Sequence, residues 1–470
     1  MPIGLATFAG VLKRENHQTS VIDAFGEAPN KLTAVGEFYF RGLTPGELAE
    51  KILPDTEAIF LYAYNVTYHE ATLGILKKIK EVHQNIPVII LENTQAVTSY
   101  SLRHVKEDFF SAGASYIVMG EPEERAVELL EKISTCESNE EIKTIDGIAS
   151  PNFTSLPVRK ILDLDTLPLP AWDLFPVSNY WKLGYAHGPL TSKKYLPIVS
   201  SRGCPYPCRF CIIPELNDTK WRARSARHVV DEMEHFQNKL GVNEFHFEDV
   251  DPTVSDVRTQ EICREILRRN LNVIWKISSG TKVETIKSEE TVDLMSQAGC
   301  RYVSISPESG SEQLMKLMKK PFNYKHAVKI VRRMAERGIR TQACFVLGFP
   351  GETAEDRKLT VKMVKDLVKE GLDEIAQFII TPVPGSSIYK DFNGFESLSE
   401  LNFSPTWRPD YELLNKFRVQ LYSKFLIWKF LYHPFSFLRQ PFNFLFRNFQ
   451  TKMEMTPFRA LHTMFLARAT

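Results

Sequence analysis

Three cysteines stand close together near the middle of the chain, in the segment CPYPCRFC. Cys204, Cys208 and Cys211 are separated by three and then by two residues. Iron–sulfur clusters are bound by cysteine thiolates, and this tight spacing lets one loop wrap a single cluster. Three thiolates on a cluster of four irons leave one iron open, and an open metal position is where a substrate coordinates. The triplet therefore predicts a 4Fe-4S site with a free coordination position.

Two other uses of cysteine fit the chain less well. A structural zinc site takes four ligands, usually as two spaced pairs, and a disulfide framework is typical of small secreted chains. The chain has 470 residues, and its other cysteines are isolated: Cys136, Cys263, Cys300 and Cys344. This usage favours a reducing compartment, so we expect a cytoplasmic protein in which an oxygen-sensitive cluster survives.

Charge and hydropathy limit the classes of function. The net charge is +1, which gives no basic footprint for nucleic acid, so we expect no nucleic-acid partner. The N-terminal residues MPIGLATFAGVLKRENHQ lack the layout of a signal peptide. No apolar run reaches the length of about 18 residues that a spanning helix needs, so we expect none.

Residues 1–135 alternate short apolar runs with amphipathic segments. Buried strands are expected at residues 21–25, 58–62, 88–91 and 116–119. Helices are expected between them, for example at 71–82 and 126–133. Strands that alternate with helices predict a doubly wound parallel α/β sheet. Ligands bind such sheets at the carboxyl ends of the strands.

Residues 136–190 are first polar and then rich in proline, so we expect a linker there. The alternation of strands and helices returns over residues 191–395. Six strands are expected at residues 196–200, 244–247, 273–277, 302–306, 341–347 and 374–380. Amphipathic segments such as 226–240 and 325–337 separate them, with apolar positions three and four residues apart.

Distinctive segments follow these expected strands in order. They are EDVD (248–251), SSGTK (278–282), SPESGS (306–311), LGFPGET (347–353) and TPVPGS (381–386). Together with the cysteine triplet and Phe210, they resemble the radical S-adenosylmethionine (SAM) superfamily. The resemblance implies a partial (β/α)6 barrel whose active site lies at the C-terminal ends of the strands. It also implies a 4Fe-4S cluster that reductively cleaves SAM to a 5′-deoxyadenosyl radical, with the protein supplying binding and orientation.

The same resemblance implies the residues that bind SAM. Glu248 or Asp249 would accept charge-assisted hydrogen bonds from the SAM ammonium. Glu308 would bind the ribose hydroxyls or the amine. Lys282 stands where many relatives have an arginine, although lysine lacks the bidentate fork. The implied SAM set is Phe210, Glu248, Asp249, Ser278, Lys282, Glu308 and Gly348.

Residues 1–135 resemble the cobalamin-binding domain that precedes the radical domain in one branch of the superfamily. Segments 2–5, 21–24 and 120–123 carry the similarity. That branch usually has an earlier strand, so we expect the first strand of the domain to be missing from this chain. Glu92-Asn93-Thr94-Gln95 also replaces a Gly-Gly-x-His stretch, whose glycines let the backbone approach the corrin. The implied cobalamin residues are Tyr64, Asn65, Asn93, Thr94, Gly120 and Glu121.

The C-terminal region, residues 396–470, is expected to be helical, aromatic and basic. Residues 413–453 contain seven Lys or Arg, twelve aromatic residues and no Asp or Glu. This pattern suits an interfacial helix at an anionic membrane surface. It also suits a helical cap on the barrel, with Lys and Arg stems along apolar surface. We expect Pro434 and Pro441 to divide the segment into short pieces.

The leading hypothesis is a radical SAM enzyme that functionalises an unactivated carbon. C-methylation through cobalamin is the outcome most often implied by the resemblance, on a hydrophobic substrate such as a lipid, isoprenoid or tetrapyrrole. A reductant protein such as flavodoxin or ferredoxin is the implied partner. Radical cyclisation or rearrangement, and a corrinoid-free enzyme with a degenerate N-terminal domain, are alternatives. A non-catalytic iron–sulfur protein at a membrane is a more remote one.

Overall fold

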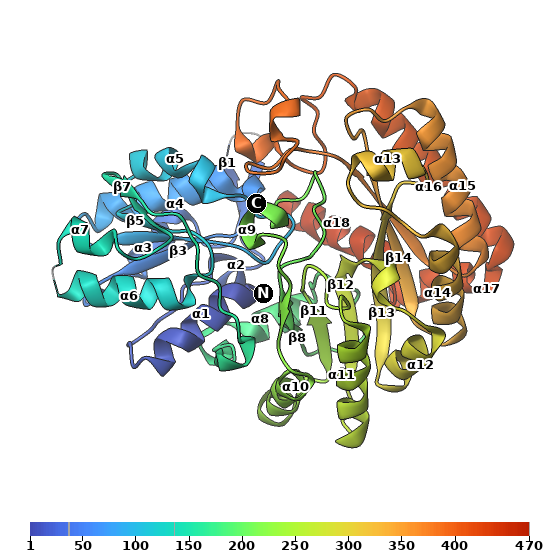
Figure 1. Cartoon of the computed structure of the whole chain (residues 1–470), viewed down its shortest axis with the longest axis horizontal. Helices are drawn as coiled ribbons and strands as arrows, with labels where there is room; N and C mark the ends of the chain where they lie inside the picture. The colour runs from blue at the N-terminus through green and yellow to red at the C-terminus, as the bar shows by residue number, and fades with distance from the viewer. Residues whose placement is uncertain (36–37, 136, 470) are drawn as a thin grey trace.

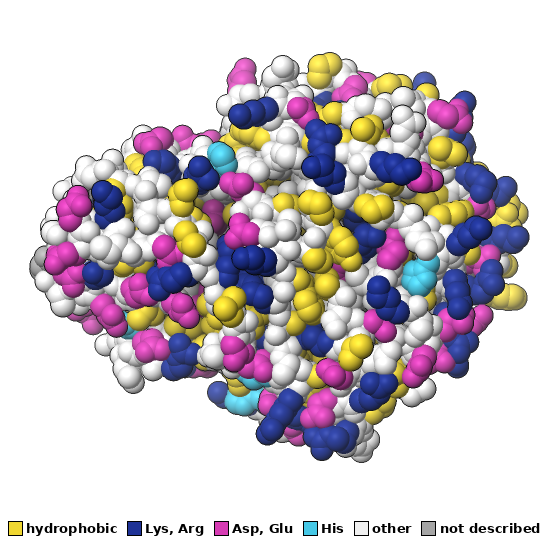
Figure 2. Space-filling model, in the orientation of Figure 1, with side chains coloured by type: hydrophobic (Ala, Val, Ile, Leu, Met, Phe, Trp, Pro, Cys, Tyr) yellow, Lys and Arg dark blue, Asp and Glu magenta, His cyan; other side chains and the backbone are white. Residues whose placement is uncertain are grey.

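A computed structural model describes residues 1–35, 38–135 and 137–469. Two α/β units lie side by side, the smaller one N-terminal and the larger one built as an open barrel (Figure 1). Charged side chains of both signs are mixed over the face that Figure 2 shows. Cys136, the first residue of the predicted linker, lies outside the described residues.

The N-terminal unit contains a five-stranded sheet with the order β3-β4-β5-β6-β7. The strands β3 (Ile59–Ala63), β4 (Val88–Glu92) and β5 (Tyr116–Val118) are parallel. The strands β6 (Ile148–Ser150) and β7 (Phe153–Thr154) continue the sheet in antiparallel pairing. Three predicted strands are therefore confirmed, and the sheet extends into the segment that we predicted as a linker.

The prediction of a strand at residues 21–25 is wrong. Asp23 is the N-cap of the short helix α2 (Ala24–Glu27), and its carboxylate accepts a hydrogen bond of 2.9 Å from the Gly26 amide. Aspartate favours such caps because its side chain competes locally for backbone donors. A separate antiparallel pair follows, formed by β1 (Leu32–Val35) and β2 (Phe38–Arg41).

Helices cover both faces of the parallel strands because β4 is apolar on both sides. Successive strand residues point to opposite faces, so that Ile89 and Leu91 enter one hydrophobic core and Val88 and Ile90 another. The first core includes α1 (Ile3–Arg14) and α6 (Pro122–Ser134). The second includes α3 (Pro45–Glu50), α4 (His69–Val82) and α5 (Lys106–Ser111). The doubly wound arrangement is confirmed.

The larger unit is built on six parallel strands in the order β8-β11-β12-β13-β14-β15. They are β8 (Tyr195–Ile198), β11 (Glu244–Phe247), β12 (Ile274–Thr281), β13 (Cys300–Glu308), β14 (Arg340–Leu347) and β15 (Glu374–Ile379). The helices on the outside are α10 (Ala226–Leu240), α11 (Asp256–Arg268), α12 (Glu289–Gln297), α14 (Tyr324–Glu336) and α15 (Ala354–Lys369). All six predicted barrel strands are thus confirmed, in the predicted order.

The inside of this open barrel is polar. Phe245 and Phe247 of β11 join the outer hydrophobic core, so Glu244 and His246 point to the other side. The contacts between inward side chains cross the barrel from strand to strand. They are Lys276 Nζ to Glu244 Oε1 at 2.8 Å, Tyr302 Oη to Glu374 Oε1 at 2.6 Å, Ser304 Oγ to Gln342 Oε1 at 3.0 Å and Ser304 Oγ to Cys344 Sγ at 3.4 Å.

Three C-terminal helices complete the unit: α16 (Tyr411–Tyr432), α17 (Pro434–Leu445) and α18 (Lys452–Ala469). The chain turns before Pro434 as predicted, whereas Pro441 lies inside α17, so the prediction of a break there is wrong. Figure 1 shows α18 running through the centre of the molecule, on the open side of the barrel. No helix in the described part of the chain is both long and apolar enough to cross a membrane.

The start of α18 is anchored inside the barrel. Lys452 Nζ donates to the Ser278 carbonyl at 3.0 Å, and the Met453 amide donates to Glu374 Oε2 at 2.7 Å. A carboxylate at the first turn of a helix satisfies free N–H groups and complements the helix dipole. The helix therefore closes the barrel from its open side, although the cap was predicted for residues 413–453, which precede most of α18.

Buried arginine–glutamate pairs join the two units. The short strands β9 (Ser201–Arg202) and β10 (Arg222–Ala223) pair with each other and present both arginines to the N-terminal end of α6. Arg222 Nη2 lies 2.6 Å from Glu121 Oε1, and Arg202 Nη2 lies 2.5 Å from Glu123 Oε1. Glu121 is 2% exposed and Arg202 6% exposed, so these charges depend on each other.

Loss of one charge from this network is expected to destabilise the protein strongly. Glu121→Gln preserves the size of the side chain but leaves buried Arg202 and Arg222 without this partner. We expect the free energy of unfolding to fall by about 3–5 kcal/mol, because a stranded buried charge is costly. Urea denaturation followed by circular dichroism measures the change.

The matched control is Glu355→Gln, which removes an exposed partner of Lys358. We expect this variant to lose less than about 1 kcal/mol, since solvent screens surface pairs. Equal losses in the two variants would contradict a special role for the buried network.

Candidate functional site

The three cysteines lie in a loop between β9 and α9 (Ile213–Asn217). Cys208 is buried, and Cys204 and Cys211 are partly exposed. The loop is fixed to the barrel by its backbone: the Arg209 amide donates to the Met318 carbonyl at 3.0 Å. The loop therefore sits at the carboxyl ends of the barrel strands, where barrel active sites form.

The environment of the three thiols suits cluster binding better than reaction with molecules in solvent. Burial raises the pKa of Cys211 to about 12 and raises the pKa of Cys204 and of Cys208 above the ordinary value. Thiolates, not thiols, bind metal, so cationic iron would supply the charge that favours them. Among the described residues, no three His, Cys, Asp or Glu side chains converge as ligands of one ion would.

The two acidic residues after β11 have different environments. Asp249 is buried, and its oxygens accept hydrogen bonds from the Ser200 amide at 3.0 Å and from the Ser201 hydroxyl at 2.6 Å. Glu248 is partly exposed, and its Oε2 lies 2.7 Å from Nδ1 of His187. Burial opposes ionisation of Glu248, yet His187 lowers the pKa of this carboxyl below its ordinary value. Of the two, Glu248 therefore has the free acceptor capacity.

Glu308, at the end of β13, is buried against Lys320. The Lys320 Nζ donates to Glu308 Oε1 at 2.5 Å, and the same ammonium lies 6.0 Å from the centre of the Phe210 ring. Burial raises the pKa of Glu308, although Lys320 opposes that shift. The backbone of Glu308 has a φ of +58°, a conformation that non-glycine residues seldom adopt. Glu308 thus has a strained backbone, and its partner Lys320 lies near Phe210 of the cysteine loop.

The remaining predicted SAM residues divide into two groups. Phe210 packs against Phe349 with ring centres 6.5 Å apart, and the Ser278 hydroxyl is buried without a partner in the described structure. Lys282 donates to the Pro321 carbonyl at 2.7 Å and pairs with Glu284 at 3.1 Å. Its ammonium is therefore already bound within the protein.

Gly348, a predicted SAM residue, lies against two side chains of the C-terminal segment. Its φ is +73°, and a Cβ atom there would lie 2.4 Å from Leu414 and 2.7 Å from Arg408. Arg408 also donates to the Gly348 carbonyl at 2.9 Å. The glycine is required by the close approach of these two side chains from the C-terminal segment.

The predicted cobalamin residues gather at the carboxyl ends of β3, β4 and β5, but most of their polar groups are used internally. Glu92 accepts from the Leu102 amide at 2.7 Å and from the Gly120 amide at 2.6 Å, and burial raises its pKa to about 7. The side-chain amide of Asn93 donates to the Tyr64 carbonyl at 2.8 Å. The end of β4 thus carries buried side chains in place of glycines, and these side chains form hydrogen bonds to nearby loops of the chain.

The other residues of this set make similar contacts. Asn65 caps a short helix by accepting from the Thr67 amide at 3.0 Å, and the Thr94 carbonyl accepts from Asn217 at 3.1 Å. Glu121 belongs to the pairs that join the two units. Tyr64 keeps an accessible ring, 44% exposed. These residues do not form the open backbone cradle that a Gly-Gly stretch gives a corrin.

Accessible polar groups line the inside of the barrel below the cysteine loop. Cys344, Ser306 and Lys452 are partly exposed although they lie inside the barrel. Nδ1 of His246 and Oγ of Ser278 are buried without a partner in the part of the chain that the structure describes. Buried polar groups normally have partners. This region therefore has free hydrogen-bonding capacity for a bound molecule.

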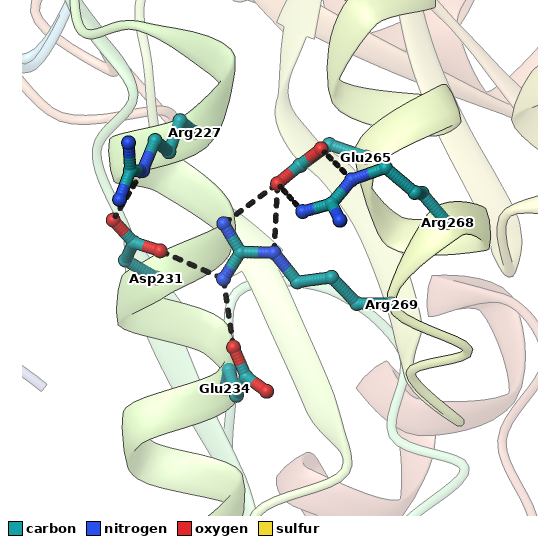
Figure 3. Close-up of a pocket in the computed structure, with 6 residues that line it drawn as sticks. All are labelled: Arg227, Asp231, Glu234, Glu265, Arg268 and Arg269. Carbon is teal, nitrogen blue, oxygen red and sulfur yellow. Dashed lines mark hydrogen bonds and ion pairs between the residues drawn. The ribbon is translucent and has the colours of Figure 1, made fainter.

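A second depression lies outside the barrel between α10 and α11 (Figure 3). Arg269 is its centre and pairs with Asp231, Glu234 and Glu265, each at 2.7 Å. The charged side chains that line this depression form ion pairs with one another. Arg268 is the last residue of α11 and Arg269 follows it, far along the chain from the cysteine loop. We interpret this depression as a surface ion-pair network.

The family model of the radical SAM superfamily matches residues 198–364. This segment contains the cysteine loop, Glu248, Glu308 and the barrel strands β11, β12, β13 and β14. Residues 198–364 form a radical SAM domain. The chain thus contains a radical SAM domain, the unit that uses a 4Fe-4S cluster and SAM in that superfamily, as the sequence predicted.

Two curated relatives extend beyond that domain. An uncharacterised methyltransferase of Pyrococcus horikoshii is 25% identical over 87% of this chain and 81% of its own length. An anaerobic magnesium-protoporphyrin IX monomethyl ester cyclase of Rubrivivax gelatinosus is 26% identical over 68% of this chain and 58% of its own. The radical SAM enzyme is therefore similar both to a methyltransferase and to a cyclase.

A solved structure has the same two-unit architecture. The radical SAM methyltransferase TsrM of Kitasatospora setae, with cobalamin and a [4Fe-4S] cluster bound, superposes with a TM-score of 0.64. It is 18% identical and covers 82% of this chain, which spans 71% of TsrM. The predicted fold, a cobalamin-binding-like unit before a radical SAM barrel, is confirmed.

Sequence reasoning missed several residues of this site. Lys320 was visible only as part of the segment MKLMKKP, and His187 only as part of the predicted linker. Lys452 reaches the barrel from the C-terminal region, more than a hundred residues beyond the strands that it contacts. No local motif marks these residues, because each acquires its neighbours through tertiary contacts.

Replacing one cysteine of the loop is expected to abolish cluster binding. Cys208→Ala removes one of three thiolates, and we expect anaerobically reconstituted protein to lose its stoichiometric iron and sulfide and its reductive cleavage of SAM. Iron and sulfide analysis and 5′-deoxyadenosine formation measure this. Cys263→Ala, in the outer hydrophobic core, is the control and should keep both. Normal 5′-deoxyadenosine formation by Cys208→Ala would refute the assignment of the loop.

Proposed function

We propose that this radical SAM enzyme generates a 5′-deoxyadenosyl radical and functionalises an unactivated carbon of a substrate held inside the barrel. The supporting observation is the cysteine loop at the carboxyl ends of the barrel strands, with the ammonium of the Glu308–Lys320 pair 6.0 Å from the ring of Phe210 in that loop. Cys204, Cys208 and Cys211 would hold the cluster. When bound, the cluster and SAM supply the radical; the residues of the chain bind, orient and exclude water.

The roles that we propose for SAM binding follow from free hydrogen-bonding capacity. Glu248 accepts from the SAM ammonium, because Asp249 already holds the Ser200 and Ser201 segment in place. Glu308 binds the ribose hydroxyls or the amine, and Phe210 covers the adenosyl side. Ser278 offers its unpaired hydroxyl. Gly348 and Lys282 support the site through packing and loop contacts.

These roles predict that two neighbouring carboxylates respond differently to amidation. Glu248→Gln should leave the fold intact and weaken SAM binding by about tenfold or more, since a charge-assisted hydrogen bond is lost. Asp249→Asn should instead lower the thermal midpoint, because it disturbs buried hydrogen bonds. Equilibrium dialysis with SAM and thermal denaturation of reconstituted protein separate the two effects. Unchanged SAM affinity in Glu248→Gln would remove this residue from the site.

C-methylation is the reaction that we propose first. The similarity to a methyltransferase over most of both chains and the architecture shared with TsrM support it. A corrinoid held by the N-terminal unit would then be the methyl donor. An electron-transfer protein such as flavodoxin or ferredoxin would reduce the cluster, in the cytoplasm. The proposed substrate has a hydrophobic body, such as a lipid, isoprenoid or tetrapyrrole, and polar groups that meet the barrel interior. Stimulation of SAM cleavage by fractionated lipid extracts tests this class.

The closed strand end at Glu92 favours a second candidate, a corrinoid-free radical cyclase or rearrangement enzyme. Glu92, Asn93 and Thr94 are buried and bonded within the chain, so the N-terminal unit would serve only to support the barrel. The similarity to a cyclase is in keeping with this chemistry.

The corrinoid content of the protein decides between these candidates. Protein purified anaerobically from cobalamin-supplied cells should contain near-stoichiometric corrinoid if methyl transfer is correct, measured by absorbance after extraction. Protein with an intact cluster but no corrinoid would favour the second candidate. Glu92→Gly, which opens the strand end, is the informative comparison: corrinoid in this variant alone would identify Glu92 as the residue that excludes it.

A further inference from the structure

The helix α17 turns its hydrophobic side toward solvent. Phe435 is 88% exposed, Phe442 61% and Leu445 71%, and Leu438 and Phe446 are exposed as well. These residues are spaced by three, four, three and one positions, so they share one face of the helix. Figure 1 places α17 at the outer edge of the molecule, and hydrophobic side chains reach that edge in Figure 2.

The side of α17 that faces the protein is mixed: Phe444 packs against Phe458 of α18, with ring centres 6.4 Å apart, and a polar residue is buried beside it. Asn443 is buried, and its side-chain amide donates to Glu454 Oε1 at 2.9 Å. A helix on the surface of a globular protein normally buries its apolar side and exposes its polar side. Here large apolar side chains remain on the exposed side, and the hydrogen bond from Asn443 holds a polar side chain toward the protein.

The apolar surface extends from α17 onto the end of α16. Phe430 of α16 contacts Phe437 of α17, with ring centres 5.7 Å apart. Ile427 and Leu431 of α16 are 57% and 63% exposed. Contiguous exposed apolar surface of this kind marks an interaction site in soluble proteins. We call the exposed residues 427, 430, 431, 435, 438, 442, 445 and 446 the α16–α17 face.

The charged side chains within the segment that carries this face have one sign. Residues 413–453 contain no Asp or Glu, and Lys424, Arg439 and Arg447 are exposed. The nearest described partners of the two arginines are neutral: Arg439 donates to Gln450 at 3.0 Å, and Arg447 lies over the Phe458 ring at 4.9 Å. Local acidic groups therefore do not neutralise these cations, which remain available to an anionic surface.

We propose that the α16–α17 face binds the interfacial region of a bilayer that contains anionic lipids. Exposed aromatic and leucine side chains enter the boundary between headgroups and acyl chains, and the flanking lysine and arginine residues contact anionic headgroups. This assigns the two hypotheses for the C-terminal region to different helices: α18 closes the barrel, and α17 contacts the membrane. The binding is peripheral, and it places a barrel proposed to take a hydrophobic substrate next to the membrane.

Vesicle co-sedimentation of the full-length reconstituted protein tests this proposal. We expect binding to vesicles of phosphatidylcholine mixed with phosphatidylglycerol and much weaker binding to phosphatidylcholine alone. Added salt should weaken the binding, because it screens exposed charges. The triple variant Phe435→Ser/Leu438→Ser/Phe442→Ser should bind about a hundredfold more weakly, since its apolar contacts are lost. Arg439→Gln/Arg447→Gln should reduce both affinity and salt dependence.

The matched control is Val158→Ser/Leu162→Ser, which removes two side chains that are 77% and 79% exposed in the segment between the units. This variant should bind vesicles as the unchanged protein does. All changed residues are exposed, so circular dichroism and SAM cleavage should stay the same in every variant. Absent vesicle binding by the unchanged protein, or an equal loss in the control, would overturn the proposal. So would a triple variant that turns a dimer into a monomer in analytical ultracentrifugation but still binds vesicles, because the face would then join two copies of the chain.

Discussion

The arrangement of the molecule depends on the buried contact between Glu121, Glu123, Arg202 and Arg222. These charges are removed from water, so they are stable only when both units are in place. Arg202 stands two residues before the first cysteine of the cluster loop. The contact therefore aligns the strand ends of the N-terminal unit with the loop that would hold the cluster. Breaking the contact would be costly, because these charged side chains would lose their partners.

In the barrel strands, alternate side chains point to opposite sides, so that packing residues lie outside and reactive residues lie inside. Outward residues such as Phe245 and Trp275 form a continuous apolar core with the surrounding helices, whereas the inward residues of β11, β12 and β13 are mostly polar. Many of the inward groups pair with each other, as Lys276 does with Glu244. Near the cysteine loop some remain free or accessible, including Ser278 and Cys344. The rigid outer core holds this reactive interior in place, and α18 shields it on the open side.

The closed strand end at Glu92 and the exposed apolar face of α17 are both departures from what is usual for such elements. A doubly wound sheet usually leaves its carboxyl edge open to a ligand, yet here a buried carboxylate ties two loop amides together. A surface helix usually hides its apolar side, yet here it exposes phenylalanines. Each departure costs stability unless something compensates for it, and such sites are where function is expected. The strand end at Glu92 bears on whether the enzyme requires a corrinoid, and α17 bears on whether it binds a membrane.

The sequence by itself determined the cluster loop, the six barrel strands and the three parallel strands β3, β4 and β5, because these depend on local spacing and apolar periodicity. It misplaced residues 21–25, where a single Asp23 cap outweighs an apolar run, and it could not distinguish Glu248 from Asp249. Tertiary structure alone decided which carboxylate is free, which cation accompanies Glu308, and which C-terminal helix enters the barrel. Those outcomes depend on contacts between residues distant in the chain, and the free energy of such contacts comes from burial and pairing that no local pattern records.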